Sequence, residues 1–262
     1  MSDKPKSHGR LAIRPTLQPS ELMKHTPDLV GVWKAKVITL FPDTFPGVLG
    51  ASLTGKALQE GKWQLETIDL RQFGIGKHRK VDDTPAGGGP GLVMRADVLA
   101  AALDHAHADL PRDRNVWPIL YMSPRGRPFA QKDAERFSKC QGVTILCGRF
   151  EGIDERVIEE FGIEEICVGD AVLTGGELPA QIMIDATTRL LPDVIGNADS
   201  ISDESFQNGL LEHPQYTQPR EWRGRKIPDV LLSGDHGAVE AWRNSEATKI
   251  TEERRPDLKS KG

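Results

Sequence analysis

Short apolar runs alternate with amphipathic, helix-like stretches along the middle of the chain. Strand-like runs fall at residues 37–41, 64–70, 116–122, 143–147 and 163–168. Helix-like stretches fall at residues 46–60, 96–109, 131–139, 154–161 and 179–190. Such alternation is typical of an α/β fold in which helices cover a largely parallel sheet. The pattern therefore predicts one α/β domain over residues 35–195.

The two ends of the chain lack this alternation. Residues 1–34 carry several prolines and scattered Lys and Arg without an apolar period. A segment of this kind buries too little apolar surface to offset its ordering entropy, which predicts a disordered basic extension. Residues 196–214 are polar and contain glycine, which predicts a flexible interdomain linker. Within residues 215–262 an apolar run at 230–232 precedes a helical stretch at 236–247, which predicts a short, mainly helical C-terminal domain.

The composition narrows the class of protein without naming a function. Of the 262 residues 38% are hydrophobic and 27% charged, which is ordinary for a soluble protein with a core. The net charge of −4 argues against a generally basic coat but leaves room for a local basic patch. Cys140, Cys147 and Cys167 form no CxxC pair, so reduced thiols are expected rather than a disulfide framework or zinc site. No apolar stretch reaches the ~18–20 residues of a membrane span and no signal core is present, which favours the cytoplasm.

Two loops rich in glycine and acidic residues each follow a strand-like run. Their sequences are CGRFEGIDERV at residues 147–157 and VGDAVLTGGELP at residues 168–179. Glycine lets a backbone approach a ligand closely, and ligands of open α/β sheets bind at the carboxyl ends of strands. The two loops therefore predict a cofactor pocket built from main chain rather than from metal ligands.

One near-match to a known motif and one pair of histidines do not predict a site. Residues 50–57 (GASLTGKA) nearly match a phosphate-binding loop, but Ala57 stands where that motif needs a magnesium-binding hydroxyl. A surface helix turn is the better interpretation. His105 and His107 lack a third nearby ligand, so they are predicted to be ordinary surface histidines rather than part of a metal site.

Three basic segments leave their roles open. The glycine loop at residues 81–91 follows four basic residues at 77–80, and it is either a solvated loop or a mobile loop that grips phosphate. Arg125 and Arg127 lie on an expected turn at residues 123–128, which is either an exposed basic turn or an anion site. A patch of arginines, Lys226 and Trp222 within residues 220–226 is either a solvated face or a surface that tracks a nucleic-acid backbone and stacks a base.

The motifs occur together in one order that resembles a known family. They are FPD at 41–43, GGGPG at 87–91, SPxG at 123–126, the two loops at 147–157 and 168–179, GLLExPxYT at 209–217 and LLSGxH at 231–236. Over roughly residues 36–256 the chain resembles bacterial tRNA (guanine-N1)-methyltransferase of the SPOUT class. The resemblance implies a SPOUT-type sheet with a deep trefoil knot, a rare exception to unknotted topology. It also implies a homodimer with active sites at the subunit interface.

The resemblance further implies S-adenosylmethionine as methyl donor and, as acceptor, the tRNA guanosine immediately 3′ to the anticodon. The implied cofactor-binding residues are Ser123, Pro124, Gly148, Glu151, Val168, Gly169, Asp170, Ala171, Val172, Leu173, Gly175, Gly176 and Pro179. Among them Glu151 would place a carboxylate near the cationic sulfonium. Ala171 departs from the aromatic residue common at its position. A magnesium requirement is compatible with this chemistry but is not readable from the residues.

Methylation of guanine N1 requires a base for its proton and a cation for charge that develops on O6. The resemblance assigns the cation to Arg189 and the base to the linker. There Glu204 stands where the family usually has Asp, and Asp203 beside it is a competitor. Two other functions remain open: a non-catalytic RNA-binding module, which would not need both Arg189 and a linker carboxylate, and a nucleotide-binding enzyme using residues 50–56, which Ala57 argues against.

Overall fold

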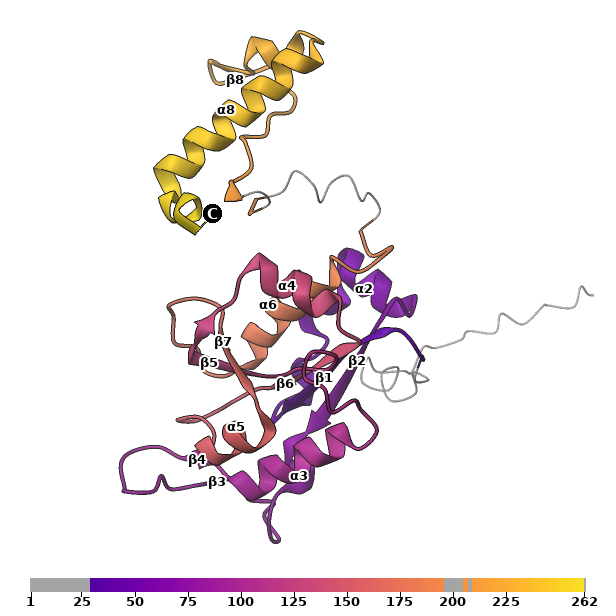
Figure 1. Ribbon diagram of the computed structural model, residues 1–262, viewed down its shortest axis with the longest axis vertical. Coiled ribbons are helices and arrows are strands. Elements are labelled where there is room, and N and C mark those ends of the chain that lie inside the picture. The colour runs from indigo at the N-terminus through magenta and orange to yellow at the C-terminus, as the bar shows by residue number, and fades with distance from the viewer. Residues whose placement is uncertain (1–28, 196–204, 207–208, 262) are drawn as a thin grey trace, which may run out of the picture. The chain divides into compact units, whose positions relative to one another are not determined.

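The computed structural model describes residues 29–195, 205–206 and 209–261 (Figure 1). The chain divides between Val194 and Ile195 into two compact units. The first unit holds a five-stranded sheet in the order β2-β1-β6-β5-β7, and every neighbouring pair is parallel. Its strands are β1 (Trp33–Thr39), β2 (Trp63–Asp69), β5 (Ile119–Pro128), β6 (Gly142–Leu146) and β7 (Glu164–Cys167). The predicted α/β fold with a largely parallel sheet is confirmed.

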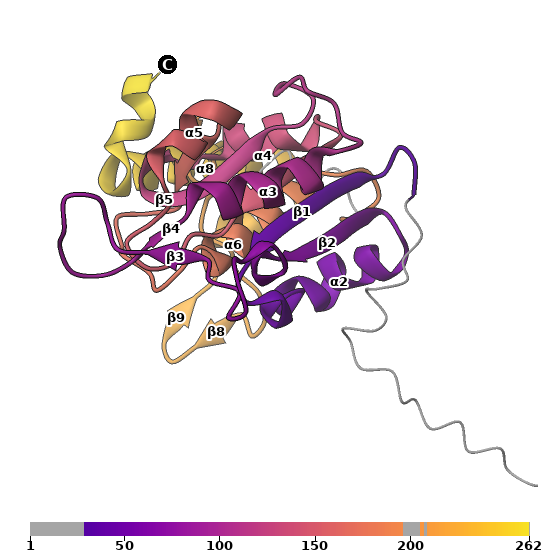
Figure 2. The same cartoon turned by 90° about the horizontal axis from the view of Figure 1, so that it is seen from below.

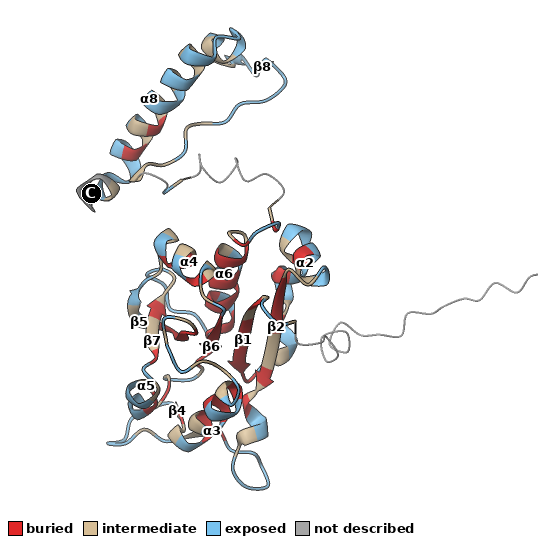
Figure 3. Cartoon of the chain, turned by 45° about the vertical axis from the view of Figure 1, so that its right-hand side comes forward, coloured by how far each residue is buried: buried red, intermediate tan, exposed pale blue. Residues whose placement is uncertain are grey.

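Helices cover both faces of this sheet (Figure 1). One face carries α2 (Ser52–Gln59), α4 (Gln131–Ser138) and α6 (Glu177–Thr188), and the other carries α3 (Ala96–His107) and α5 (Glu155–Phe161). Successive β1 residues show the consequence, since Val37 and Ile38 are both 0% exposed but belong to hydrophobic clusters on opposite faces. Buried residues line the strands and the inner sides of the helices (Figure 3). Burial on both faces explains why the strands read as apolar runs.

The first strand begins earlier than the sequence indicated. Trp33 and Ala35 are 5% and 0% exposed, whereas Lys34 and Lys36 alternate with them and reach Glu66 with their ammonium groups. This alternation buries alternate side chains while the lysines keep their charges near the surface. Residues 33 and 34, assigned to the N-terminal extension, therefore belong to β1. The prediction for residues 1–28 lies outside the described residues.

The helix expected at residues 46–60 is divided in two. A 3-10 turn at Gly47–Gly50 precedes α2, and Ala51 between them is extended. The near-match to a phosphate-binding loop thus consists of this turn and the first residues of a helix. It does not follow a strand, as a phosphate-binding loop would.

A short antiparallel pair flanks the glycine loop, and the sequence analysis did not anticipate it. The strands are β3 (Asp82–Asp83) and β4 (Val93–Met94). Figure 2 shows the loop between them extending away from the sheet. The two strands are too short for a detectable apolar alternation.

The second unit contains one long helix and a small hairpin. The elements are β8 (Glu221–Trp222), β9 (Arg225–Lys226), a 3-10 turn at Asp229–Leu232 and α8 (His236–Arg254), followed by a 3-10 segment at Pro256–Lys261. The helix begins at the predicted residue because the Asp235 carboxylate accepts a hydrogen bond from the Ala238 amide at 3.0 Å, an N-cap. It continues beyond the predicted end at residue 247. Across the described residues, we find no helix of the length and apolar character that a membrane crossing requires.

Candidate functional site

The two glycine-and-acid loops meet at the carboxyl end of the sheet. One follows β6 and the other follows β7. The Gly176 amide donates a hydrogen bond to the Gly148 carbonyl oxygen at 3.0 Å, which joins the two loops directly. The structure therefore brings together these two residues, both predicted to bind cofactor.

The predicted turn after residue 122 is instead a bulge within a continuing strand. Met122 and Arg127 of β5 both pair with Ile166 of β7, so residues 123–126 loop out of the ladder. A side chain at Gly126 would lie less than 3.0 Å from the backbone of Ile166, so only glycine permits this approach. The bulge carries Ser123, which is 5% exposed, and Pro124, which is exposed. A strand prediction that ends at 122 was wrong because Pro124 and Gly126 resemble a turn locally.

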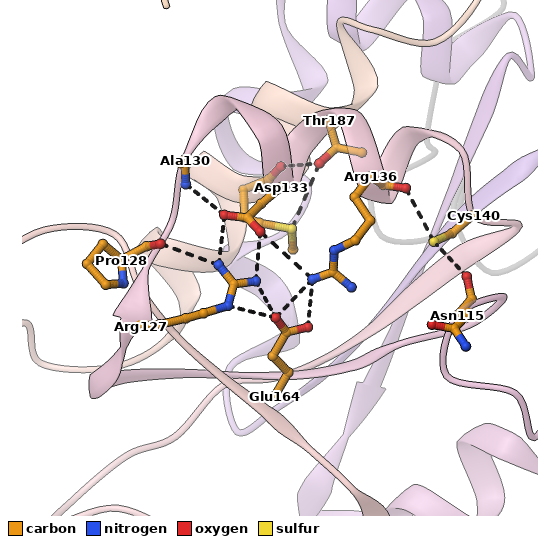
Figure 4. Close-up of polar contacts among 10 residues, drawn as sticks. Asn115, Arg127, Pro128, Ala130, Asp133, Arg136, Cys140, Glu164 and Thr187 are labelled. Carbon is orange, nitrogen blue, oxygen red and sulfur yellow. Dashed lines mark hydrogen bonds and ion pairs between the residues drawn. The ribbon is translucent and has the colours of Figure 1, made fainter. Parts of the chain in front are cut away.

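A network of charged side chains holds the far end of the bulge (Figure 4). Arg127 donates to Asp133 and Glu164 at 2.9 Å each, and Arg136 of α4 donates to Glu164 at 2.7 Å. Asp133 also accepts a hydrogen bond from the Ala130 amide at 2.9 Å. Burial alone would raise the pKa of Asp133, but hydrogen bonds from Arg127 and Ala130 and the nearby guanidinium charges lower it below its ordinary value. The network joins β5, β7 and α4 around the bulge.

The arginine inside the bulge is also paired within the chain. Arg125 donates to Glu155 of α5 at 2.9 Å and to Glu165 of β7 at 3.1 Å. Both arginines of the segment thus bind carboxylates of the same chain. This favours a structural role over the anion site that the sequence left open.

The loop after β7 is exposed over residues 169–174. Val172 is 87% exposed and Leu173 43% exposed. Gly176 and Pro179, further along the predicted cofactor set, are buried. An exposed loop at the carboxyl end of a strand lies where ligands of open α/β sheets bind.

The glycine loop between β3 and β4 lies against the loop after β6. The Glu151 amide donates to the Leu92 carbonyl at 2.9 Å, and the Met94 amide donates to the Gly152 carbonyl at 2.9 Å. Glu151 itself is exposed, so its carboxylate is accessible to a ligand. The end of the glycine loop therefore fixes the backbone that carries Glu151.

Two buried titratable groups near these loops are unsuited to act as bases. Burial raises the pKa of Tyr121, and the nearby Glu165 adds to the rise. Burial, helped by the charge of Glu177, raises the pKa of the Cys147 thiol well above its ordinary value. Both groups therefore stay protonated at neutral pH and serve the packing of the strand ends.

The predicted catalytic residues are only partly within the described structure. Arg189 is the C-cap of α6, where its amide donates to the Asp185 carbonyl at 3.1 Å. Asp203 and Glu204 lie outside the described residues. Among the residues that are described, no group of three or more His, Cys, Asp or Glu side chains could hold a metal ion.

In the second unit the hairpin β8–β9 carries the basic and aromatic patch. Trp222 is 56% exposed, and the Arg223 guanidinium lies over its ring at 4.8 Å from the centroid. Residues of the same unit, among them Tyr216, line a pocket of about 260 Å³. The Tyr216 ring also meets the Trp242 ring edge to face, with the centroids 6.1 Å apart. The predicted patch therefore lies at the surface of this unit, where a cationic and an aromatic side chain contact each other.

Sequence reasoning passed over Arg149 and Glu177, although both lie inside the recognised loops. Glu177 is 4% exposed, and Arg149 forms an ion pair with it at 2.8 Å. A buried carboxylate needs a partner, but the sequence does not say which of many arginines supplies it. The available signal was that both residues lie in loops expected at the same end of the sheet.

Comparison with known proteins identifies the family. The family model described as tRNA (Guanine-1)-methyltransferase TrmD matches residues 33–261. A tRNA (guanine-N(1)-)-methyltransferase from Jannaschia sp. (strain CCS1) is 67% identical over 236 residues, which is 90% of this chain and 96% of the relative. Proteins of the same name from Ruegeria sp. (strain TM1040) and Gluconobacter oxydans (strain 621H) are 63% and 56% identical, over 90% and 86% of this chain and 96% and 94% of their own lengths.

The match covers both units and every motif that carried the resemblance. The loops after β6 and β7 and the β5 bulge, which meet at one end of the sheet, all fall within it. The chain therefore belongs to the tRNA (guanine-1)-methyltransferase family of the SPOUT class.

Proposed function

We propose that this protein transfers a methyl group from S-adenosylmethionine to N1 of the guanosine immediately 3′ to the anticodon of tRNA. The observation that carries the proposal is the convergence of three loops at one sheet end in a chain of this family. The loops are the β5 bulge and the segments after β6 and β7. S-adenosylmethionine would supply an electrophilic methyl group. Residues of the chain would bind this donor, remove the proton from guanine N1 and stabilise the charge on O6.

The three loops would hold the methyl donor chiefly through main chain. Residues 169–174 are exposed at the strand end, and Ser123 and Pro124 lie on the bulge of the neighbouring strand. Gly148 joins the two loops through its carbonyl oxygen. The exposed Glu151 carboxylate would lie near the sulfonium, whose positive charge it offsets.

Proton removal from the guanine would fall to the linker. Glu204 is the preferred base and Asp203 the competitor, while Arg189 at the end of α6 would stabilise charge on O6. A positioned base of this kind typically contributes about 10²–10⁴-fold to the rate. Methyl transfer measured with and without a chelator tests whether the reaction requires magnesium.

A second copy of the chain is the proposed partner of the exposed side of α6. Leu178 and Ile182, one helical turn apart, are 62% and 52% exposed. Val172 and Leu173, 87% and 43% exposed, lie on the loop that leads into the same helix. Apolar side chains gathered beside the candidate site favour a homodimer whose interface borders the cofactor loops.

Transfer RNA is the proposed ligand of the hairpin in the second unit. Arginines and Lys226 on β8–β9 would contact phosphates, and the exposed Trp222 offers a ring face for stacking. An enzyme acting on tRNA in this way would work in the cytoplasm.

The acceptor is tested by methyl transfer to paired transcripts. Labelled S-adenosylmethionine is incubated with the full-length protein and a tRNA transcript that has guanosine 3′ to the anticodon, or the same transcript with adenosine there. We expect label only in the guanosine transcript. Equal labelling of the two transcripts would overturn the proposed acceptor.

A further inference from the structure

The guanidinium group of Arg149 connects three chain segments at the carboxyl end of the sheet. Its Nη1 donates to the Thr174 carbonyl oxygen at 3.0 Å, and its Nε donates to Glu177 Oε1 at 3.3 Å. Its Nη2 lies 2.8 Å from Glu177 Oε2, which completes a two-point ion pair. The guanidinium also stacks over the Phe41 ring at 4.4 Å from the centroid.

The partner carboxylate is itself fixed from β1. Thr39 Oγ1 donates to Glu177 Oε1 at 2.7 Å, and the same hydroxyl accepts a hydrogen bond from the Phe41 amide at 3.0 Å. Thr39 is 0% exposed and Glu177 4% exposed. Arg149 balances the charge of this buried carboxylate, so releasing the arginine would leave that charge uncompensated.

The Arg149 side chain lies directly against Gly175 of the loop after β7. A side chain at Gly175 would lie less than 3.0 Å from the guanidinium of Arg149. A side chain at Gly175 would therefore displace the guanidinium from this position. The exposed loop at residues 169–174 thus ends at an anchored point, Thr174 to Glu177.

We propose that Arg149 is the positioning residue that sets the loop after β7 in the shape that receives the methyl donor. This inference rests on the proposed function, because it assigns the exposed residues 169–174 to that ligand. Arg149 acts through Thr174 and Glu177, because its planar guanidinium group donates hydrogen bonds to both residues at the same time. Lysine keeps the charge but offers a single point contact, so it cannot hold the carboxylate at two points and the carbonyl together.

The test compares Arg149→Lys with a matched control, Arg156→Lys. Arg156 is 79% exposed and forms an ion pair with Asp154, the N-cap of its own helix α5. Binding of S-adenosylmethionine to the full-length protein is measured by calorimetry, alongside the thermal midpoint and kcat. We expect Arg149→Lys to weaken binding by about tenfold or more, since small displacements of positioned groups have effects of that size. The control should bind like the wild-type protein.

A double variant separates positioning from stability. Arg149→Gln alone leaves the Glu177 carboxylate buried and unpaired, so its thermal midpoint should fall. Arg149→Gln combined with Glu177→Gln removes both charges and should recover the midpoint, while binding stays weak because the loop anchor is still absent. Recovery of binding together with the midpoint would overturn the positioning role, as would wild-type affinity in Arg149→Lys. Failure of the wild-type protein to bind S-adenosylmethionine would instead overturn the proposed function.

Discussion

Individual side chains near the sheet show how local chemistry depends on distant partners. His107 closes α3, and its Nε2 is buried without a hydrogen-bond partner among the described residues. Burial, followed by the positive charges of Arg114 and Lys36, lowers its pKa from 6.5 to about 4. The sequence analysis took this histidine for a surface residue, because the apolar face of α3 could not be seen to extend to its last turn.

The lowered pKa of His107 predicts a pH-dependent stability. Between pH 6.5 and about 4 the unfolded chain binds a proton at this site and the folded chain does not, so acidification favours unfolding. The stability that the folded protein owes to a neutral His107 is therefore fully present above pH 6.5 and is lost as the pH falls toward 4. Urea unfolding at pH 7 and pH 5 should show a larger loss of stability in the wild-type protein than in His107→Leu. Equal losses in the two proteins would contradict the assignment.

The proposed base in the linker also belongs to this scale. Glu204→Gln should bind S-adenosylmethionine normally but lose about 10²-fold or more of kcat, because only proton removal is affected. Asp203→Asn is the matched variant one residue away, and it should retain activity. If the two effects are reversed, Asp203 is the base. Full activity in both variants would contradict a linker carboxylate as base.

At the scale of elements, the structure explains which predictions succeed. Alternating apolar runs predicted the five strands of the sheet because both faces are covered, so the signal is local and strong. The bulge in β5 is different, since its form is set by pairing with β7 about forty residues away. Ser-Pro-x-Gly reads as a turn until that partner strand is known. The contacts of Arg149 could not be predicted for the same reason, because its partners Thr174 and Glu177 belong to a different loop.

The bulge should not tolerate a side chain at Gly126. Gly126→Ala would place a methyl group against the backbone of Ile166, and overpacking of this kind costs about 1–3 kcal/mol. We expect a lower thermal midpoint and weaker binding of S-adenosylmethionine, measured by calorimetry. Gly237→Ala is the control, because its nearest neighbour would be an Asp235 oxygen at 3.5 Å and alanine favours a helix. Wild-type binding and stability in Gly126→Ala would refute the role of the bulge.

At the scale of the whole molecule, family membership covers both units, whereas the trefoil knot and the homodimer remain predictions. The sequence could predict the family because its motifs keep one order over the chain. It could not predict the geometry of the site, since the loops that form it come from segments far apart in the sequence. The exposed side of α6 is the feature of the first unit that most directly implies a second copy.

A charge on that side of α6 should separate the copies. Ile182→Glu should elute from gel filtration at the 28.9 kDa mass of one chain, where the wild-type protein should elute at twice that mass. The variant should also lose methyl transfer as it loses the dimer, because the active sites are proposed to border the interface. Glu159→Lys on α5, which covers the other face of the sheet, is the control and should remain dimeric. A dimeric Ile182→Glu would place the interface elsewhere.

The central claim is methyl transfer to guanine N1, and nucleoside mass spectrometry tests it most directly. A tRNA transcript with guanosine 3′ to the anticodon is treated with the full-length protein and S-adenosylmethionine, then digested and analysed by position. The account predicts 1-methylguanosine at that position and nowhere else in the transcript. A methyl group on another atom or another nucleotide, or an unmodified transcript, would contradict it.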